Sequence, residues 1–327
     1  MDKVKIAIVG CGGMGGRHLL GLKELYESGM CNVELAAACD LRQDNAERLA
    51  DNAKDLLGAR PKVFGGMADM VKAIPDLQGA IITTDAGSHH IVATQAFELG
   101  LNVLSEKPLG ISIHACNLIL AAQEKAGKLL SVAENYRRDP MSRLTRALID
   151  AGVIGQPYLF FDISAGGGNT IIILPWRHYK HMGGMVIDGG VHNADMMLYY
   201  MGDANEVYAK TKLWEETRYK GARIGVGDFY QAWYAEIPDS ITATSEDMFV
   251  SVIQFKSGAY ANWTQFYSGH GKGFGQKALY GSKGSLIVGG TRNGVSPVLH
   301  IDGQPELTGD ALLELVPDYH LDEITQC

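Results

Sequence analysis

The chain has 327 residues, of which 46% are hydrophobic and 20% charged, and its formal net charge is −8 at pH 7. At roughly 100–200 residues per domain this length predicts two domains, and the apolar content excludes a disordered chain. The acidic balance, without a run of basic residues, excludes a typical nucleic-acid binder, and no apolar stretch approaches the roughly 18 residues of a membrane-spanning helix.

The first residues and the cysteines indicate a compartment. Residues 1–5 lead into only a few apolar residues before the first glycine, so we expect no secretory signal. The five cysteines are an odd number and show no Cys-x-x-Cys spacing, which favours free thiols in a reducing environment. We therefore expect a cytoplasmic protein.

Residues 1–133 alternate short apolar runs with amphipathic segments. Strands are predicted at residues 4–9, 33–39, 62–64, 79–83 and 102–105, and helices at 17–28, 44–57, 67–73 and 91–99. Short buried strands that alternate with helices are typical of a parallel, doubly wound α/β sheet. We predict that residues 1–133 form one such domain.

The pattern changes in residues 134–327. Helices are predicted at 141–151 and 188–201, and strands at 158–164, 207–213, 248–255, 260–267, 277–280 and 285–288. Turns rich in glycine and serine, at 256–258 and 281–284, suit hairpins between these strands. The second half therefore predicts an α+β domain with an antiparallel or mixed sheet.

A glycine-rich motif lies between the first strand and the first helix. Gly10 allows a tight turn, Gly12 lets the backbone approach a pyrophosphate, and Gly15 lets the helix pack close to the strand. Gly13 and Met14 complete the motif at the start of the helix, where free N–H groups favour phosphate. The motif predicts a dinucleotide-binding loop.

Asp40 ends the second predicted strand, 25 residues after Gly15. A carboxylate at this place accepts the hydroxyls of a ribose and repels a 2′-phosphate, so NAD is favoured over NADP. Arg42 is an alternative, because its guanidinium could hold that phosphate, or it is a solvated residue at the start of a helix. We predict NAD as the cofactor, with NADP as the second choice.

A second group of chemically active residues follows. Lys107 comes directly after a predicted strand, where the carboxyl ends of parallel strands form a ligand crevice, unless it is a surface lysine beside a turn proline. Asp188 and His192 are four residues apart, so they share one face of a helix, and Asp195 falls nearby. A carboxylate, an imidazole and a lysine near a nicotinamide suit hydride transfer coupled to proton transfer.

Together and in order, these segments resemble the glucose–fructose oxidoreductase/myo-inositol dehydrogenase (Gfo/Idh/MocA) family over nearly the whole chain. The resemblance rests on the Glu106-Lys107-Pro108 triplet and on the glycine-rich segment 183–195, which contains Asp188 and His192. Further matching segments are 84–89, 135–140, Trp176-Arg177 and Glu246-Asp247. Asp85 replaces the proline that is usual there, and the chain ends at Cys327 without the usual closing helix.

The resemblance implies an NAD(P)-binding Rossmann domain, followed by a substrate-binding domain with an open, mainly antiparallel sheet that supports homodimers or homotetramers. It implies that Lys107, Asp188 and His192 are catalytic. The expected further cofactor contacts are Thr84, His89, Glu106 and Lys107. The expected substrate contacts are Lys107, Tyr136, Arg137, Trp176, Arg177, Asp188 and His192.

The first functional hypothesis is an NAD-dependent oxidoreductase for a secondary hydroxyl of a sugar, glycoside or cyclitol. His192 or Lys107 would take the hydroxyl proton, and Asp188 would fix the hydroxyl or the lysine. One alternative is a glycosidase that oxidises its sugar transiently with tightly held NAD. Another is a non-catalytic dinucleotide-sensing regulator, which the presence of all three catalytic candidates disfavours.

The histidines raise the question of a metal. His178, His181, Asp188 and His192 include spacings that zinc could use, but the His-Glu-x-x-His pattern is absent, so we predict no metal. The remaining histidines are expected to be surface or packing residues. The aromatic residues of 263–267 are expected to pack within a sheet rather than to stack on a ligand.

Overall fold

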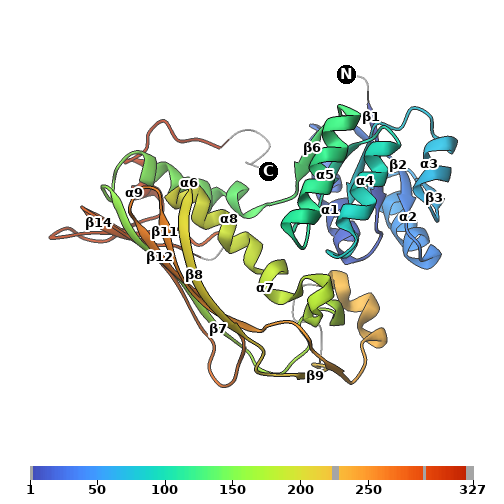
Figure 1. Ribbon diagram of the computed structural model, residues 1–327. Coiled ribbons are helices and arrows are strands. Elements are labelled where there is room, and N and C mark those ends of the chain that lie inside the picture. The colour runs from blue at the N-terminus through green and yellow to red at the C-terminus, as the bar shows by residue number, and fades with distance from the viewer. Residues whose placement is uncertain (1–2, 223–227, 290–291, 322–327) are drawn as a thin grey trace.

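The computed structural model of the protein describes residues 3–222, 228–289 and 292–321. Within these residues the strands form one six-stranded sheet, one eight-stranded sheet and a two-stranded ribbon. Figure 1 shows the six-stranded sheet with its helices as one lobe and the eight-stranded sheet with helices α6 and α8 as the other. This confirms the predicted α/β fold, a Rossmann-like parallel sheet followed by a mixed sheet.

The six-stranded sheet is parallel throughout and has the order β3-β2-β1-β4-β5-β6. Its strands are β1 (Val4–Val9), β2 (Val33–Cys39), β3 (Lys62–Phe64), β4 (Gly79–Ile82), β5 (Asn102–Ser105) and β6 (Leu130–Val132). The strand order reverses direction between β1 and β4. In open α/β sheets, ligands bind beyond the carboxyl ends of the strands at such a point.

Helices cover both faces of this sheet. They are α1 (Gly13–Glu27), α2 (Gln43–Leu57), α3 (Met67–Ala73), α4 (His89–Glu98) and α5 (Ile113–Ala126). Alternate residues of β1 explain why two layers form: Ala7 and Val9 join the core beneath α4, whereas Ile8 joins the core beneath α1 and α2. Burial on both faces accounts for the uninterrupted apolar runs in the sequence.

The eight-stranded sheet has the order β16-β15-β14-β13-β7-β12-β11-β8. Only the β7–β12 pair is parallel, and the other neighbours are antiparallel. The strands are β7 (Pro157–Gly167), β8 (Ala204–Lys212), β11 (Met248–Phe255), β12 (Tyr260–Gly269), β13 (Phe274–Gly281), β14 (Gly284–Ile287), β15 (Val298–Ile301) and β16 (Leu307–Thr308). The ribbon pairs β9 (Thr217–Tyr219) with β10 (Ser240–Thr242).

One face of this sheet packs on α6 (Pro140–Asp150) and α8 (Gly190–Met201). Leu148, Phe160 and Met197, which are almost fully buried, lie in the core between them. Short helices complete the described chain: η1 (Tyr136–Arg138), η2 (Pro175–His178), η3 (Lys180–Met182), α7 (Gly184–Asp188), η4 (Asp228–Glu236) and α9 (Asp310–Leu313). In Figure 1, α7 and α8 run from the eight-stranded sheet toward the parallel lobe.

The single helix predicted over 188–201 is wrong in one respect, because it is divided into α7 and α8 at Gly189. Gly189 keeps helical backbone angles and donates its N–H to the carbonyl of Met185 at 2.9 Å, so the two helices follow each other closely. A Cβ at Gly189 would lie 2.9 Å from Oη of Tyr267, and one at Gly190 would lie 3.2 Å from the ring of Trp263. The two glycines therefore let this helix lie close to β12.

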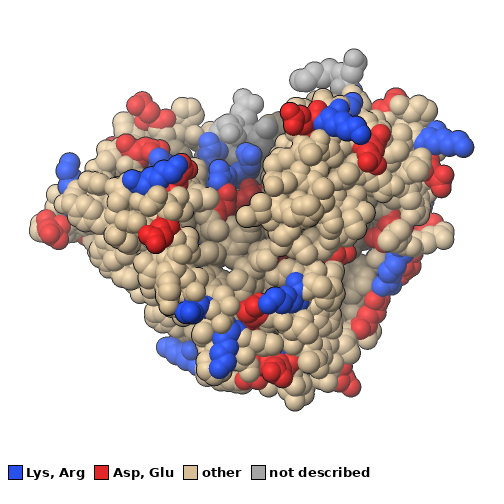
Figure 2. All heavy atoms as spheres, viewed as in Figure 1, with Lys and Arg blue, Asp and Glu red and all other residues tan. Residues whose placement is uncertain are grey.

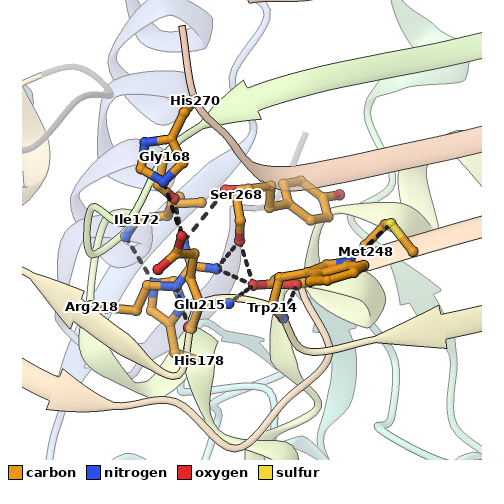
Figure 3. A network of polar contacts seen from close by, with 11 residues as sticks. Gly168, Ile172, His178, Trp214, Glu215, Arg218, Met248, Ser268 and His270 are labelled. Carbon is orange, nitrogen blue, oxygen red and sulfur yellow. Dashed lines mark hydrogen bonds and ion pairs between the residues drawn. The ribbon is translucent and has the colours of Figure 1, made fainter.

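A buried polar network fixes the loop that follows β7 (Figure 3). Arg218 is fully buried and donates to Asp247 at 2.8 Å and to the carbonyl of Gly168 at 2.8 Å. Asp247 also accepts the N–H groups of Trp214 and Glu215, each at 2.9 Å, and the hydroxyl of Ser268. The predicted Glu246-Asp247 segment thus holds structure together at the start of β11.

His178 joins the same region. Its Nε2 accepts the N–H of Ile172 at 2.9 Å, and its carbonyl accepts two N–H groups, from Thr244 and Ser245. Burial, and then the nearby cations Arg218 and Arg177, lower the pKa of His178 from its usual 6.5 to about 4. A neutral His178 therefore fixes η2, the turn that carries Trp176 and Arg177.

Candidate active site

A cavity of about 670 Å³ lies between the two lobes, which Figure 2 shows separated by a hollow. Its lining comes from the glycine-rich loop, the ends of the parallel strands, η2, α7 and η4. The lining includes Gly10, Gly12, Gly13, Met14, Asp40, Thr84, Asp85, His89, Glu106, Lys107, Trp176, Arg177, Asp188 and Tyr230. Most of the residues that the sequence singled out therefore share one cavity.

Each glycine of the loop is required for a different physical reason. Gly10 has φ +93°, and a Cβ there would lie 2.7 Å from the backbone of Thr84. A Cβ at Gly15 would lie 2.5 Å from the carbonyl oxygen of Gly10, so this glycine lets α1 approach β1. At Gly12 no described atom beyond its two chain neighbours lies within 4 Å of such a Cβ, which leaves room for a ligand phosphate beside the start of α1.

Asp40 faces the same cavity from the end of β2. Its carboxylate accepts the N–H of Cys11 at 2.6 Å and the N–H of Arg42 at 2.8 Å, so its position is fixed by two backbone donors. Arg42 is not among the cavity-lining residues. Its guanidinium instead pairs with Asp44 and Glu236, each through a contact of 2.7 Å.

The turn after β4 is built by side chains that bind to backbone. Asp85, which replaces the expected proline, accepts the N–H of Ser88 at 3.1 Å near the start of α4. Nδ1 of His89 lies 2.7 Å from the carbonyl oxygen of Pro108, and its Nε2 lies 3.1 Å from that of Thr84. The buried imidazole of His89 thus joins the Thr84 turn to the segment that carries Lys107.

Glu106 is buried at the end of β5 and has a partner that the sequence did not indicate. Nε2 of His18, on α1, lies 3.0 Å from Oε1 of Glu106, and the other carboxylate oxygen accepts the N–H of Lys107 at 3.0 Å. His18, expected to be a surface or packing residue, therefore connects α1 to the end of β5.

Lys107, Asp188 and Arg177 form a charged cluster at the boundary of the lobes. Nζ of Lys107 donates to Oδ1 of Asp188 at 3.1 Å and to its carbonyl at 2.9 Å, and Nε of Arg177 donates to Oδ2 at 2.7 Å. Burial opposes ionisation of Asp188, but the two cations outweigh it and hold the pKa of this carboxyl below its usual value. Asp188 therefore orients both cations toward one cavity.

Arg177 is fixed from several sides. Its guanidinium stacks on Trp176 at 4.3 Å from the ring centroid and lies 5.7 Å from the ring centroid of Tyr230. Its Nη1 is buried and has no hydrogen-bond partner in the part of the chain that the structure describes. A buried guanidinium with an unused donor in a cavity wall is suited to an oxygen atom of a ligand.

His192 lies in the first turn of α8, four residues after Asp188, and unlike Asp188 it is not among the residues that line the cavity. Its Nδ1 lies 2.7 Å from Oε2 of Glu134, and its ring stacks on Tyr136 with 3.9 Å between centroids. Burial raises the pKa of Glu134, but the contacts with His192 prevail and leave it below its usual value. Glu134 was not predicted; its only sequence signal is its position directly before the Asn135-Tyr136-Arg137 segment.

Arg137, a predicted substrate contact, is bound to Asp195. Nε of Arg137 lies 2.7 Å from Oδ2 of Asp195, and Nη2 donates to the other carboxylate oxygen, so the two residues form a bidentate pair. Neither Tyr136 nor Arg137 lines the cavity described above. Their predicted contacts with substrate stay predictions.

The described residues were predicted to hold no metal, and they contain the histidines that zinc could use. In the described ranges, no group of three or more His, Cys, Asp or Glu side chains is arranged to hold a metal ion. His178, one of the zinc candidates, uses its Nε2 to accept a backbone N–H. In the same ranges, no helix has the length and apolar character to cross a bilayer.

The chain is similar to known dehydrogenases in sequence and in fold. The scyllo-inositol 2-dehydrogenase (NAD(+)) of Bacillus subtilis is 24% identical over 75% of this chain and 63% of its own length. The levoglucosan dehydrogenase of Pseudarthrobacter phenanthrenivorans is 25% identical over 94% of this chain and 79% of its own. A crystal structure of levoglucosan dehydrogenase in complex with NADH has the same fold, with a TM-score of 0.75 at 21% identity, covering 94% of this chain and 80% of that one.

Two family models account for most of the sequence. Residues 4–134 match the oxidoreductase family with an NAD-binding Rossmann fold, and residues 142–287 match the Gfo/Idh/MocA C-terminal domain. The chain therefore belongs to the Gfo/Idh/MocA family of NAD-binding oxidoreductases.

Proposed function

We propose that the protein is an NAD-dependent dehydrogenase that oxidises a secondary hydroxyl of a sugar, glycoside or cyclitol, or catalyses the reverse reduction. The observation that carries this proposal is the Lys107–Asp188–Arg177 cluster in the same cavity as the glycine-rich loop and Asp40. The inositol and levoglucosan dehydrogenases among its relatives support the substrate class.

Different residues would bind different parts of the cofactor. The open space at Gly12 and the start of α1 would hold the pyrophosphate, and Asp40 would accept the ribose hydroxyls. Thr84, His89 and Glu106 would line the path toward Lys107. When bound, the nicotinamide accepts the hydride from the substrate carbon, or returns it in the reverse direction.

Proton transfer would fall to the protein. With Nδ1 facing Glu134, the Nε2 atom of His192 is the nitrogen that would take the hydroxyl proton. Lys107, held by Asp188, would donate a hydrogen bond to the substrate oxygen and stabilise its developing charge. Arg177, through its unused Nη1, would orient a second oxygen, as a polyol allows.

NAD is the proposed cofactor in preference to NADP. Asp40 would repel a 2′-phosphate, and the guanidinium of Arg42 is engaged by Asp44 and Glu236. A cytoplasmic location is also proposed, on the four described cysteines, all of which are free thiols.

A homo-oligomer is proposed from the outer face of the eight-stranded sheet. Large side chains stand exposed there on neighbouring strands, among them Tyr208, Val252, Tyr260 and Tyr280. An apolar sheet face of this kind suits a second copy of the chain. Light scattering after size exclusion would give the mass of the assembly.

The proposed reaction is tested by following NADH absorbance with purified protein, NAD⁺ and a panel of cyclitols, anhydrosugars and glycosides. Stoichiometric formation of NADH and a ketone with at least one polyol supports the proposal. Release of an aglycone without net NADH, or no reaction across the panel in either direction, would contradict it.

A further inference from the structure

An ion pair joins the two lobes at the edge of the cofactor cavity. Nη1 and Nη2 of Arg42 donate to the two carboxylate oxygens of Glu236, at 2.7 and 3.0 Å, although the residues are 194 positions apart. Nε and Nη2 of the same guanidinium donate to Asp44 at 3.2 and 2.7 Å. All three nitrogens of Arg42 are therefore bound to carboxylates.

Arg42 lies just after the end of β2, at the position where a Rossmann domain distinguishes NADP from NAD. Its backbone N–H donates to Asp40, the carboxylate that faces the cavity from the end of β2. In Rossmann domains an arginine near this carboxylate is the side chain that accommodates a 2′-phosphate. A phosphate at Arg42 would have to displace Glu236, because a bidentate pair leaves no donor on that side.

Glu236 is held in place by the rest of η4. Nε1 of Trp233 donates to Asn45 at 3.2 Å, and the guanidinium of Arg48 stacks on the Trp233 ring at 4.6 Å. A Cβ at Gly13 would lie 2.5 Å from the ring of Tyr230, so η4 also contacts the first turn of α1. In Figure 1, η4, in orange, lies beside the parallel lobe although it belongs to the second half of the chain.

We propose that Glu236 is a specificity-determining residue that excludes NADP by occupying Arg42. The second lobe would thereby contribute to cofactor choice, a role that motifs within the Rossmann domain alone do not reveal. This inference rests on the proposed binding of a dinucleotide with its ribose at Asp40.

The charges are consistent with this role. Hydrogen bonds from Arg42 hold the pKa of Glu236 and that of Asp44 below their usual values, so both are ionised at neutral pH. A 2′-phosphate arriving here would meet these two carboxylates and Asp40 around one guanidinium. The repulsion would act on NADP and leave NAD unaffected.

The test is calorimetric titration of Glu236→Gln with NADP⁺ and NAD⁺, at low and high salt. We expect NADP⁺ to bind about five- to tenfold more tightly than it binds to the parent, and NAD⁺ to bind within about twofold of the parent. The gain is expected to shrink with added salt. Glu246→Gln, which removes an exposed ion pair with Lys180, is the matched control and is expected to change neither affinity.

Two more variants separate the mechanism from a general charge effect. Glu236→Asp keeps the charge and is expected to keep the parent's ratio of affinities, whereas Arg42→Ala/Glu236→Gln is expected to lose the NADP⁺ gain. An unchanged ratio in Glu236→Gln, or a gain that persists without Arg42, would overturn the proposal. Because binding is measured without turnover, either result stands apart from whether the protein oxidises a polyol.

Discussion

Nδ1 of His192 lies 2.7 Å from Oε2 of Glu134, although the two residues are 58 positions apart. The carboxylate fixes which imidazole nitrogen faces away from it and stabilises the charged ring that forms on proton uptake. Glu134 is therefore expected to act through His192, as a positioning residue.

Replacing Glu134 tests this relationship. Glu134→Gln removes the charge and is expected to lower kcat about 100-fold while KM changes little, because the loss falls on proton transfer. Glu134→Asp is expected to recover part of the activity. A fall in kcat equal in both variants, or a change confined to KM, would speak for a merely structural role. Steady-state kinetics on the best polyol substrate gives both constants.

Gly12 tests the cofactor site. Gly12→Val places a side chain in the open space beside the start of α1 and is expected to abolish NAD⁺ binding while the fold is retained. Gly21→Val, on the helix that Gly12 precedes and with no described atom within 4 Å of its Cβ beyond the helix's own backbone, is the control that should bind NAD⁺ normally. Calorimetry reads binding and circular dichroism reads the fold. Normal NAD⁺ binding by Gly12→Val would contradict a pyrophosphate site at this loop.

Asp247 tests the network that holds the loop before α7. Asp247→Asn leaves the fully buried Arg218 without its counter-charge and is expected to lower the free energy of unfolding by about 3–5 kcal/mol. Asp203→Asn breaks an exposed pair with Lys256 and is expected to cost about 0–1 kcal/mol. Urea denaturation of both variants measures the difference. Equal effects would mean that Arg218 is compensated by its other partners.

His178 gives the fold a pH dependence. Its folded pKa, about 4, lies below the unfolded value of 6.5, so the unfolded chain binds the extra proton first as pH falls. Its contribution to stability is complete above pH 6.5, declines from pH 6.5 to 4 and is constant below, amounting to about 3 kcal/mol. His178→Gln can still accept the N–H of Ile172 but does not titrate. Between pH 6.5 and 4 its free energy of unfolding should therefore fall by about 3 kcal/mol less than that of the parent. A parallel pH curve for the variant would contradict a buried neutral histidine.

Local sequence patterns predicted most strands and helices of the parallel sheet. The apolar run of β1 ends directly before Gly10, and that of β2 ends directly before Asp40. At both places the chain leaves the buried sheet and turns toward a helix, so the change from apolar residues to glycine or aspartate marks the end of the strand. Helix α5 was not predicted, because exposed Leu118 and Leu120 blur its apolar face, of which only Ala115 and Ile119 are buried. Helix α1 begins at Gly13 rather than at the predicted Arg17, because three glycines form its first turn.

The site was predictable where its residues are consecutive and not where distant segments meet. Lys107 and Asp188 could be named from motifs, and the structure brings them within 3.1 Å. His18 and Tyr230 carry no such signal, since each gains its place only when α1 meets β5 or η4 meets the glycine-rich loop. Long-range contacts of this kind depend on the assembled fold and not on spacing along the chain.

We propose that Lys107 and His192 act on the substrate oxygen and proton and are not needed to bind the cofactor. The most direct measurement is kcat for polyol oxidation by Lys107→Ala and His192→Ala, made beside calorimetric NAD⁺ affinities for the same proteins. We predict that kcat falls by about 10²–10⁴-fold in each variant while NAD⁺ binds within about twofold of the parent. Turnover by both variants within a few-fold of the parent would contradict a catalytic role for Lys107 and His192.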